Sequence, residues 1–169
     1  MGNVAEMIIY HGSDCIVDNP KILESLRPLD FGGGFYLTSN KQQAIAWAKR
    51  VAYRKKTALA HISSYKFDLS LAKKSLKIIQ FDKPNKEWLQ FVCKNRRKRP
   101  ITTAYDIVIG PVADDSVYET IIAFENGLYD QAETLKRLKV EKLADQILFH
   151  TSASLEFIRF LNSEVVKYE

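Results

Sequence analysis

Cysteine and histidine are scarce in this 169-residue chain, which has two cysteines and three histidines. Cys15 and Cys93 form no C-x-x-C pair, and the three histidines add no plausible set of metal ligands. The sequence therefore argues against structural zinc and against a disulfide framework, and no metal site is expected.

Long apolar runs are also absent. No stretch approaches the roughly 20 apolar residues that a membrane helix needs. The first residues, MGNVAEMIIYHGS, show no basic segment followed by an apolar one. We therefore expect a cytoplasmic protein that acts without a membrane. With 46% hydrophobic and 27% charged residues, the chain is predicted to form one domain over residues 1–169.

Acidic residues are few in the middle of the chain. Residues 41–100 hold 17 Lys or Arg against 3 Asp or Glu, and the remaining residues hold 8 against 17. The net charge of +5 therefore hides a basic middle and acidic flanks. Such a field attracts a dinucleotide, a nucleic acid or an acidic protein, although a solvated surface is an equal interpretation. Aromatic residues do not interleave regularly with these charges, so single-strand binding is only weakly indicated.

Glycine is used sparingly, yet three glycines stand in a row in DFGGGFYLTSNKQQAIAWA, residues 30–48. A P-loop would need Gly-Lys-Ser/Thr after its spacer, and a dinucleotide fingerprint would need G-x-G-x-x-G after a strand. Neither pattern is present. The glycines precede a predicted strand at 35–38 and so do not join a strand to a helix as a phosphate-binding loop does.

Hydrophobic periodicity, capping residues and turn signals predict a mixture of helices and strands without an internal repeat. Strands are predicted over residues 7–10, 35–38, 59–67, 76–81, 105–109 and 147–151. Helices are predicted over residues 20–26, about 39–54, 85–96, 114–124, 130–138 and 152–161. Because helices and strands do not alternate as βαβ units require, we predict an α+β fold with mostly antiparallel sheet and flanking helices.

Three motifs occur in an informative order. YHGS closes the first predicted strand, GGFY enters a later one, and DQILFH begins a strand near the C-terminus. In this order the chain resembles the ADP-ribosyltransferase superfamily, in its diphtheria-toxin-like and poly(ADP-ribose) polymerase-like branch. Within that branch it looks like a bacterial and phage family of toxin-antitoxin type with a His-Tyr-Gln triad. The resemblance extends over most of the chain and implies an ADP-ribosyltransferase-like fold with a split sheet, and NAD as substrate.

The resemblance assigns roles residue by residue. It implies a catalytic triad of His11, Tyr36 and Gln146. His11 would bind the 2′-hydroxyl of the adenine ribose, and Gly12 would hold the nicotinamide carboxamide through its backbone groups. Tyr36 would stack on nicotinamide, and Trp47 matches the position of a second stacking ring that closes the slot.

Ser13 and Gly34 complete the NAD-binding set that the resemblance implies. The glycines before Tyr36 would let the chain pass close to the ligand and steer the ring into the slot, because glycine tolerates backbone angles that other residues do not. On this interpretation the three glycines serve a nicotinamide clamp.

The sequence departs from the polymerase pattern at two positions. Gln146 stands where a glutamate is typical, and Ala44 stands where a serine is expected. Glutamine keeps the hydrogen bonding of glutamate but loses its charge, so we expect transfer of one ADP-ribose and no polymer synthesis. The nearest candidates for a base that activates the acceptor are the carboxylates Asp114, Asp115 and Glu119.

Other interpretations of single residues stay open. Alone, His11 would be taken for a structural histidine and Trp47 for a core residue. His150 could face the same side as Gln146, but a packing or hydrogen-bonding role is favoured. Cys15 could act as a nucleophile with His11 as its base, although a cysteine hydrolase ranks well below the transferase.

Two classes of function follow from these observations. The first is an enzyme that cleaves the nicotinamide glycosidic bond of NAD and passes ADP-ribose to a protein or nucleic acid, or to water as a glycohydrolase. The second is a non-catalytic module that binds NAD, ADP-ribose or a nucleic acid. An RNA 2′-phosphotransferase relative is a third interpretation. If the chain is a toxin, we expect a small acidic antitoxin protein whose binding weakens as salt rises.

Overall fold

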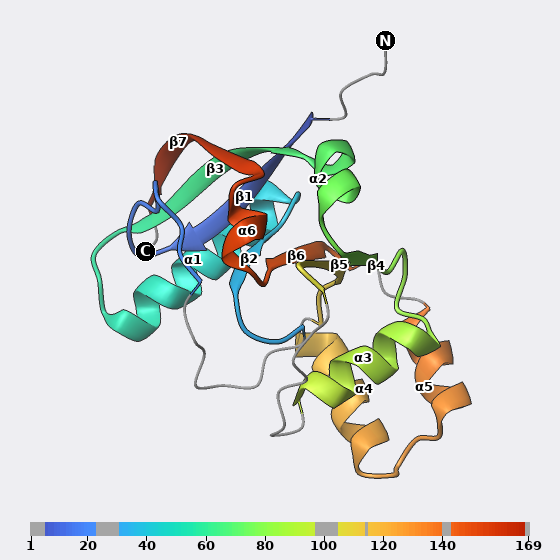
Figure 1. Cartoon of the computed structure of the whole chain (residues 1–169). Helices are drawn as coiled ribbons and strands as arrows, with labels where there is room; N and C mark the ends of the chain where they lie inside the picture. Colours follow the sequence, from blue (N-terminus) through green and yellow to red (C-terminus); the bar gives the residue numbers. More distant parts are fainter. Residues whose placement is uncertain (1–5, 23–30, 97–104, 114, 140–142, 168–169) are drawn as a thin grey trace.

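The computed structural model describes residues 6–22, 31–96, 105–113, 115–139 and 143–167 (Figure 1). In this part of the chain the elements are β1 (Glu6–Ser13), β2 (Phe35–Leu37), α1 (Lys41–Lys55), β3 (Ala60–Asp68), α2 (Leu69–Ser75), β4 (Ile78–Gln80), α3 (Lys86–Arg96), β5 (Ile107–Pro111), α4 (Asp115–Glu125), α5 (Gln131–Leu138), β6 (Asp145–Phe149), α6 (Ser152–Leu155) and β7 (Ile158–Val166). None of these helices combines the length and the apolar character needed to cross a membrane.

The strands form two sheets. One sheet has the order β1-β3-β7 with antiparallel pairs, and the other has the order β2-β6-β5-β4, in which the β4-β5 pair is parallel. An isolated bridge between Tyr10 and Thr38 links the two sheets through backbone hydrogen bonds of 2.8 and 3.0 Å. The predicted α+β class with mostly antiparallel sheet is therefore confirmed.

A core of alternating strand residues lies between the two sheets. Ile9 of β1 and Phe67 of β3 pack in one cluster with Ile107 of β5 and Phe149 of β6, and all four are fully buried. The rings of Phe67 and Phe149 meet edge to face with centroids 5.1 Å apart. Because successive strand residues point to opposite faces, Gln146 and Leu148 of β6 face away from this core.

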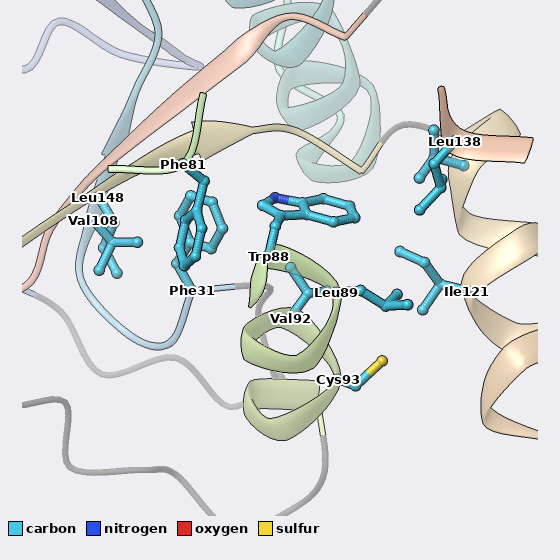
Figure 2. Close-up of a cluster of buried hydrophobic side chains, with 11 residues drawn as sticks. Phe31, Phe81, Trp88, Leu89, Val92, Cys93, Val108, Ile121, Leu138 and Leu148 are labelled. Carbon is cyan, nitrogen blue, oxygen red and sulfur yellow. The ribbon is translucent and has the colours of Figure 1, made fainter. Parts of the chain in front are cut away.

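A second core fills the space between the four-stranded sheet and helices α3, α4 and α5, which lie together below that sheet in Figure 1. Trp88 of α3 is fully buried in its middle, and Figure 2 shows its indole between Phe81 and Phe31 on one side and Leu138 on the other. The indole Nε1 donates a hydrogen bond to the Pro111 carbonyl oxygen at 3.0 Å. Helix α3 is thereby fixed against the end of β5.

Helix α1 packs on the outer face of the three-stranded sheet. Asn40 caps its first turn by accepting a hydrogen bond from the Gln43 N–H at 3.1 Å. Ala44, Ala48 and Ala52 recur every fourth residue and are fully buried. Small side chains at this spacing let the helix backbone approach β1 and β3 closely, which positions Trp47 next to β1.

Several predicted elements differ from the observed ones. Residues 152–161 do not form one helix: α6 ends after one turn, and β7 pairs antiparallel with β3. Ile158 and Phe160 are two residues apart and both pack against the core between the sheets, which is the spacing of a strand and not of a helix. Helix α2 is unpredicted, and Asp68 caps it by accepting from the Leu71 N–H at 2.9 Å. In the predicted helix at 20–26, residues 20–22 are not helical, and residues 23–26 lie outside the described residues.

Candidate functional site

A cavity of about 860 Å³ opens where β1, β2 and β6 meet helices α1, α3 and α4. Five residues singled out in the sequence line it together: His11, Gly12, Tyr36, Trp47 and Gln146. They come from four elements, of which β2 and α1 are neighbours in the chain and β6 follows about a hundred residues later. The volume lies in the range of pockets that bind small molecules and cofactors.

His11 is oriented by a hydrogen bond to the backbone of β2. Its Nδ1 lies 2.8 Å from the Tyr36 carbonyl oxygen, and its ring lies against Phe35 with centroids 4.3 Å apart. A carbonyl oxygen can only accept, so Nδ1 carries the proton and Nε2 of the neutral ring is an acceptor. Burial lowers the pKa of His11, and the bond to the Tyr36 carbonyl opposes this effect.

The lowered pKa of His11 predicts a pH dependence of stability. The unfolded ring takes up a proton near pH 6.5, whereas the folded ring does so only at lower pH. The contribution of this ring to the free energy of unfolding is therefore fully present above about pH 6.5 and is lost as the pH falls toward the folded pKa. Urea unfolding of the wild type and of His11→Gln between pH 8 and pH 5 should show the wild type losing more stability. Parallel curves would contradict a ring that stays neutral in the folded protein.

Tyr36 is held by the glycine segment that precedes it. Its hydroxyl donates to the Gly32 carbonyl oxygen and accepts from the Phe31 N–H at 3.3 Å. Gly32 has a φ of 97°, a conformation that favours glycine. The Gly33 carbonyl oxygen lies 2.6 Å from the His150 Nδ1. The carbonyl oxygens of this segment are thus bound by protein side chains, which fix the Tyr36 ring at the cavity.

Gly12 allows α1 to lie directly on β1. A Cβ atom at this position would lie 2.1 Å from the Ala44 carbonyl oxygen and 2.7 Å from the Ala48 nitrogen, both in the helix backbone. The N–H and C=O of Gly12 lie in the plane of the sheet, along its hydrogen-bonding direction. Tyr10 directs its N–H and C=O to Thr38, and the β1–β3 register runs without a shift. Because alternate residues of an antiparallel strand bond toward the same edge, Gly12 also directs its N–H and C=O away from β3.

Gln146 is 4% exposed and lies on the helix-facing side of the four-stranded sheet. Its Nε2 donates to the Pro111 carbonyl oxygen at 3.5 Å, the same oxygen that accepts from Trp88. With its amino group toward Pro111, the side chain has its Oε1 as the acceptor. A neutral hydrogen-bonding group is therefore built into the cavity wall.

A protein-family model described as "Protein of unknown function (DUF3990)" matches residues 7–160, from the second residue of β1 to the third of β7. The chain belongs to the DUF3990 family. No curated protein and no solved structure matches it. Every residue that lines the cavity falls within the matched range, so the cavity belongs to the DUF3990 region itself.

Two residues predicted to bind NAD are not among those that line the cavity of this DUF3990 chain. Ser13 donates a hydrogen bond to Asp14 at 3.2 Å, at the end of β1. Gly34 has a φ of 148° and fits against β6, where a Cβ would lie 2.4 Å from the Phe149 carbonyl oxygen. Gly34 therefore serves the packing of β2 on β6. The hydrogen-bonding role favoured for His150 is confirmed by its bond to Gly33.

The candidate bases have different positions. Asp114 and the side chain of Asp115 lie outside the described residues, and Glu119 is exposed and does not line the cavity. Sequence reasoning missed Glu125, which does line it. Glu125 lies seven residues after the lining residue Tyr118 and hence on the same face of α4. In the described residues of this DUF3990 chain, no group of three or more His, Cys, Asp or Glu could hold a metal ion.

Sequence reasoning also missed the face of α1 that Trp47 shares. Arg50, Val51 and Arg54 line the cavity and follow Trp47 at intervals of three, four and seven residues. This spacing places them on one helix face, a signal that was available in the sequence. Arg96 of α3 and Tyr118 of α4 belong to the same lining, but no local pattern connects them to α1.

Proposed function

We propose that this DUF3990 chain is an NAD-dependent mono-ADP-ribosyltransferase that transfers ADP-ribose to a macromolecular acceptor. The observation that carries the proposal is the single cavity lined by His11, Gly12, Tyr36, Trp47 and Gln146. The resemblance to the superfamily names these residues from their motifs alone. Their meeting around one space of suitable size is independent support.

The nicotinamide ring would be held between aromatic side chains. Tyr36 is fixed by its bonds to the glycine segment, and Trp47 is partly buried on the neighbouring helix. The backbone N–H and C=O of Gly12 point away from β3 and are suited to a carboxamide, which has one donating and one accepting end. This arrangement would orient the glycosidic bond in the cavity.

His11 and Gln146 would act on the two riboses. The neutral His11 ring offers Nε2 as an acceptor for a ribose hydroxyl, and Gln146 offers its amide oxygen to a hydroxyl of the nicotinamide ribose. When the bond between the ribose carbon and the nicotinamide nitrogen breaks, its electron pair leaves with nicotinamide. The ribose becomes positively charged, and a fixed dipole beside it stabilises the transition state. A nucleophile of the acceptor then bonds to the ribose carbon and loses its proton.

Glu125 is the candidate to accept that proton. It is an exposed carboxylate that lines the cavity, so an acceptor could approach it from solvent. A positioned carboxylate that takes a proton in the transition state contributes about 10²- to 10⁴-fold to a rate. The resemblance does not assign this residue.

Incubation of the purified protein with NAD labelled in its adenylate half, alone and with a cell lysate, tests the function. Nicotinamide release together with a labelled macromolecule is expected, and digestion with protease or nuclease identifies the acceptor class. Release of nicotinamide without labelled product would indicate a glycohydrolase. NAD binding without release would indicate a non-catalytic module, and absence of both contradicts the proposal.

Removing either aromatic ring should weaken NAD binding. We expect Tyr36→Ala and Trp47→Ala each to lose about 1 to 3 kcal/mol of binding free energy, because a stacked contact and its buried area are lost. Tyr36→Phe keeps the ring and should bind NAD more tightly than Tyr36→Ala. Calorimetric titration with NAD, and with nicotinamide as competitor, measures these affinities. Tyr129→Ala, outside the cavity lining, is the control, and equal affinity in all variants would refute the slot.

A further inference from the structure

Three guanidinium groups from two separate helices line the cavity. Arg50 and Arg54 belong to α1, and Arg96 is the last residue of α3. Glu125 is the carboxylate in the described lining, so the arginines outweigh it. Three arginines of the basic middle of the chain therefore meet at this cavity, and a ligand with more than one negative charge fits it better than a neutral one.

Arg96 has an unused hydrogen-bonding group. Its guanidinium carbon lies 4.1 Å from the centroid of the Tyr118 ring, and its Nη1 is buried without a hydrogen-bond partner among the described residues. A buried charged donor without a partner is costly, so such groups are usually paired with an anion. The planar fork of arginine binds phosphate oxygens in pairs.

A second arginine on a tyrosine ring shows the difference. Arg137 of α5 lies 4.2 Å from the centroid of the Tyr129 ring, but its Nε donates to Glu133 at 2.9 Å. Its side chain is about half exposed and does not line the cavity. The contact of an arginine with a tyrosine ring therefore does not by itself indicate a binding site. Arg96 differs because the residue lines the cavity and one of its donors is buried without a partner among the described residues.

The spacing along α1 relates these cations to the nicotinamide slot. Arg50 and Arg54 follow Trp47 by three and seven residues on one helix face. At 1.5 Å per residue they lie roughly 5 and 10 Å further along the helix axis. A ligand whose aromatic ring lies beside Trp47 would extend its next groups along this face toward the arginines.

We propose that Arg96, supported by Tyr118 and together with Arg50 and Arg54, forms a subsite for the diphosphate of a nucleoside diphosphate. The inference rests on the proposed function insofar as that diphosphate is the ADP part of NAD. The chemistry required is two adjacent phosphoryl groups with several negative charges. The stacked Arg96 presents its fork to one phosphoryl group, and the arginines of α1 neutralise the other.

Calorimetric titration with ADP, inorganic pyrophosphate and adenosine tests the subsite without any catalysis. We expect ADP and pyrophosphate to bind and adenosine to bind much more weakly. Arg96→Gln should weaken ADP binding about 10- to 100-fold, the loss typical of a hydrogen bond to a charged group. Arg96→Lys should bind ADP with intermediate affinity because it keeps the charge but loses the fork. Arg137→Gln is the matched control and should bind ADP like the wild type.

The outcomes separate the subsite from the reaction. Loss of ADP binding in Arg96→Gln with unchanged nicotinamide binding supports the subsite, even if the wild type releases no nicotinamide from NAD. Equal ADP affinity in the wild type and Arg96→Gln overturns it, even if nicotinamide is released. Binding of adenosine as tightly as ADP also overturns it. If Arg96→Gln fails to fold, the same comparisons are decided by Arg96→Lys and Tyr118→Leu.

Discussion

Replacing Gln146 with alanine is expected to lower the rate of nicotinamide release by about 10²- to 10³-fold while leaving NAD binding nearly unchanged, as when a fixed hydrogen-bonding group at a developing charge is removed. Gln146 is buried, and its amino group points to the Pro111 carbonyl oxygen, so its amide dipole is oriented before the substrate arrives. Nicotinamide release over time, with calorimetric titration of NAD on the same preparations, measures both quantities.

Two further variants make the Gln146 result specific. Gln146→Glu restores the carboxylate of the polymerase pattern, and a retained or raised rate of NAD hydrolysis would show that this position acts on the transition state. Gln80→Ala removes an exposed glutamine from the same sheet and should turn over like the wild type. Wild-type products should carry one ADP-ribose per site on a gel. Wild-type turnover by Gln146→Ala, or long ladders of polymer, would show that the third catalytic residue is placed wrongly.

Gly12→Ala should destabilise the fold by about 3 kcal/mol, the upper part of the usual range for overpacking a core. The added methyl group would lie 2.1 Å from the Ala44 carbonyl oxygen, and helix backbone cannot rotate away as a side chain can. Helix α1 would have to move off β1, which also displaces Trp47. Urea unfolding measures the loss.

Gly33→Ala is the matched control for Gly12→Ala. No atom lies within 4 Å of a Cβ built at Gly33, and its φ is not in the positive region. Its effect should stay within about 0.5 kcal/mol, as for most surface substitutions. Equal stability of the two variants would show that α1 does not rest on Gly12.

The sequence predicted those features that have a local cause. A capping residue at Ser39 or Asn40 and the helical spacing of the apolar residues after it predicted α1, and short apolar runs predicted most strands. The strand β7 was missed because its pattern also fits a helix, and its extended form depends on pairing along its length with β3, as in the pair Phe160 and Tyr65. Local sequence signals cannot distinguish helix from strand where pairing with a strand distant in the chain determines which one forms.

The residues of the candidate site also fall into two groups, those that a local motif identifies and those that only the folded structure brings to the cavity. The motifs around His11, Tyr36 and Gln146 are short and contiguous, so the sequence could name these residues, and their roles stay predictions. Arg96 and Glu125 reach the cavity through the packing of α3 and α4 below the four-stranded sheet. No spacing in the chain encodes that meeting. Charge counting found the basic segments but not the cavity that three of their arginines line.

The pairing of β2 with β6 also determines when the cavity can first exist during synthesis. Phe35 of β2 pairs with Phe149 of β6. Strand β2 therefore gains this neighbour only after more than 100 further residues have been synthesised. At about 5 to 20 residues per second, ribosomes need roughly 5 to 20 s to translate that interval. Until β6 has left the exit tunnel, β2 has no neighbour in the four-stranded sheet, and Gln146 is missing from the cavity wall. The cavity is therefore complete only after β6, which supplies Gln146 to its lining, has been synthesised.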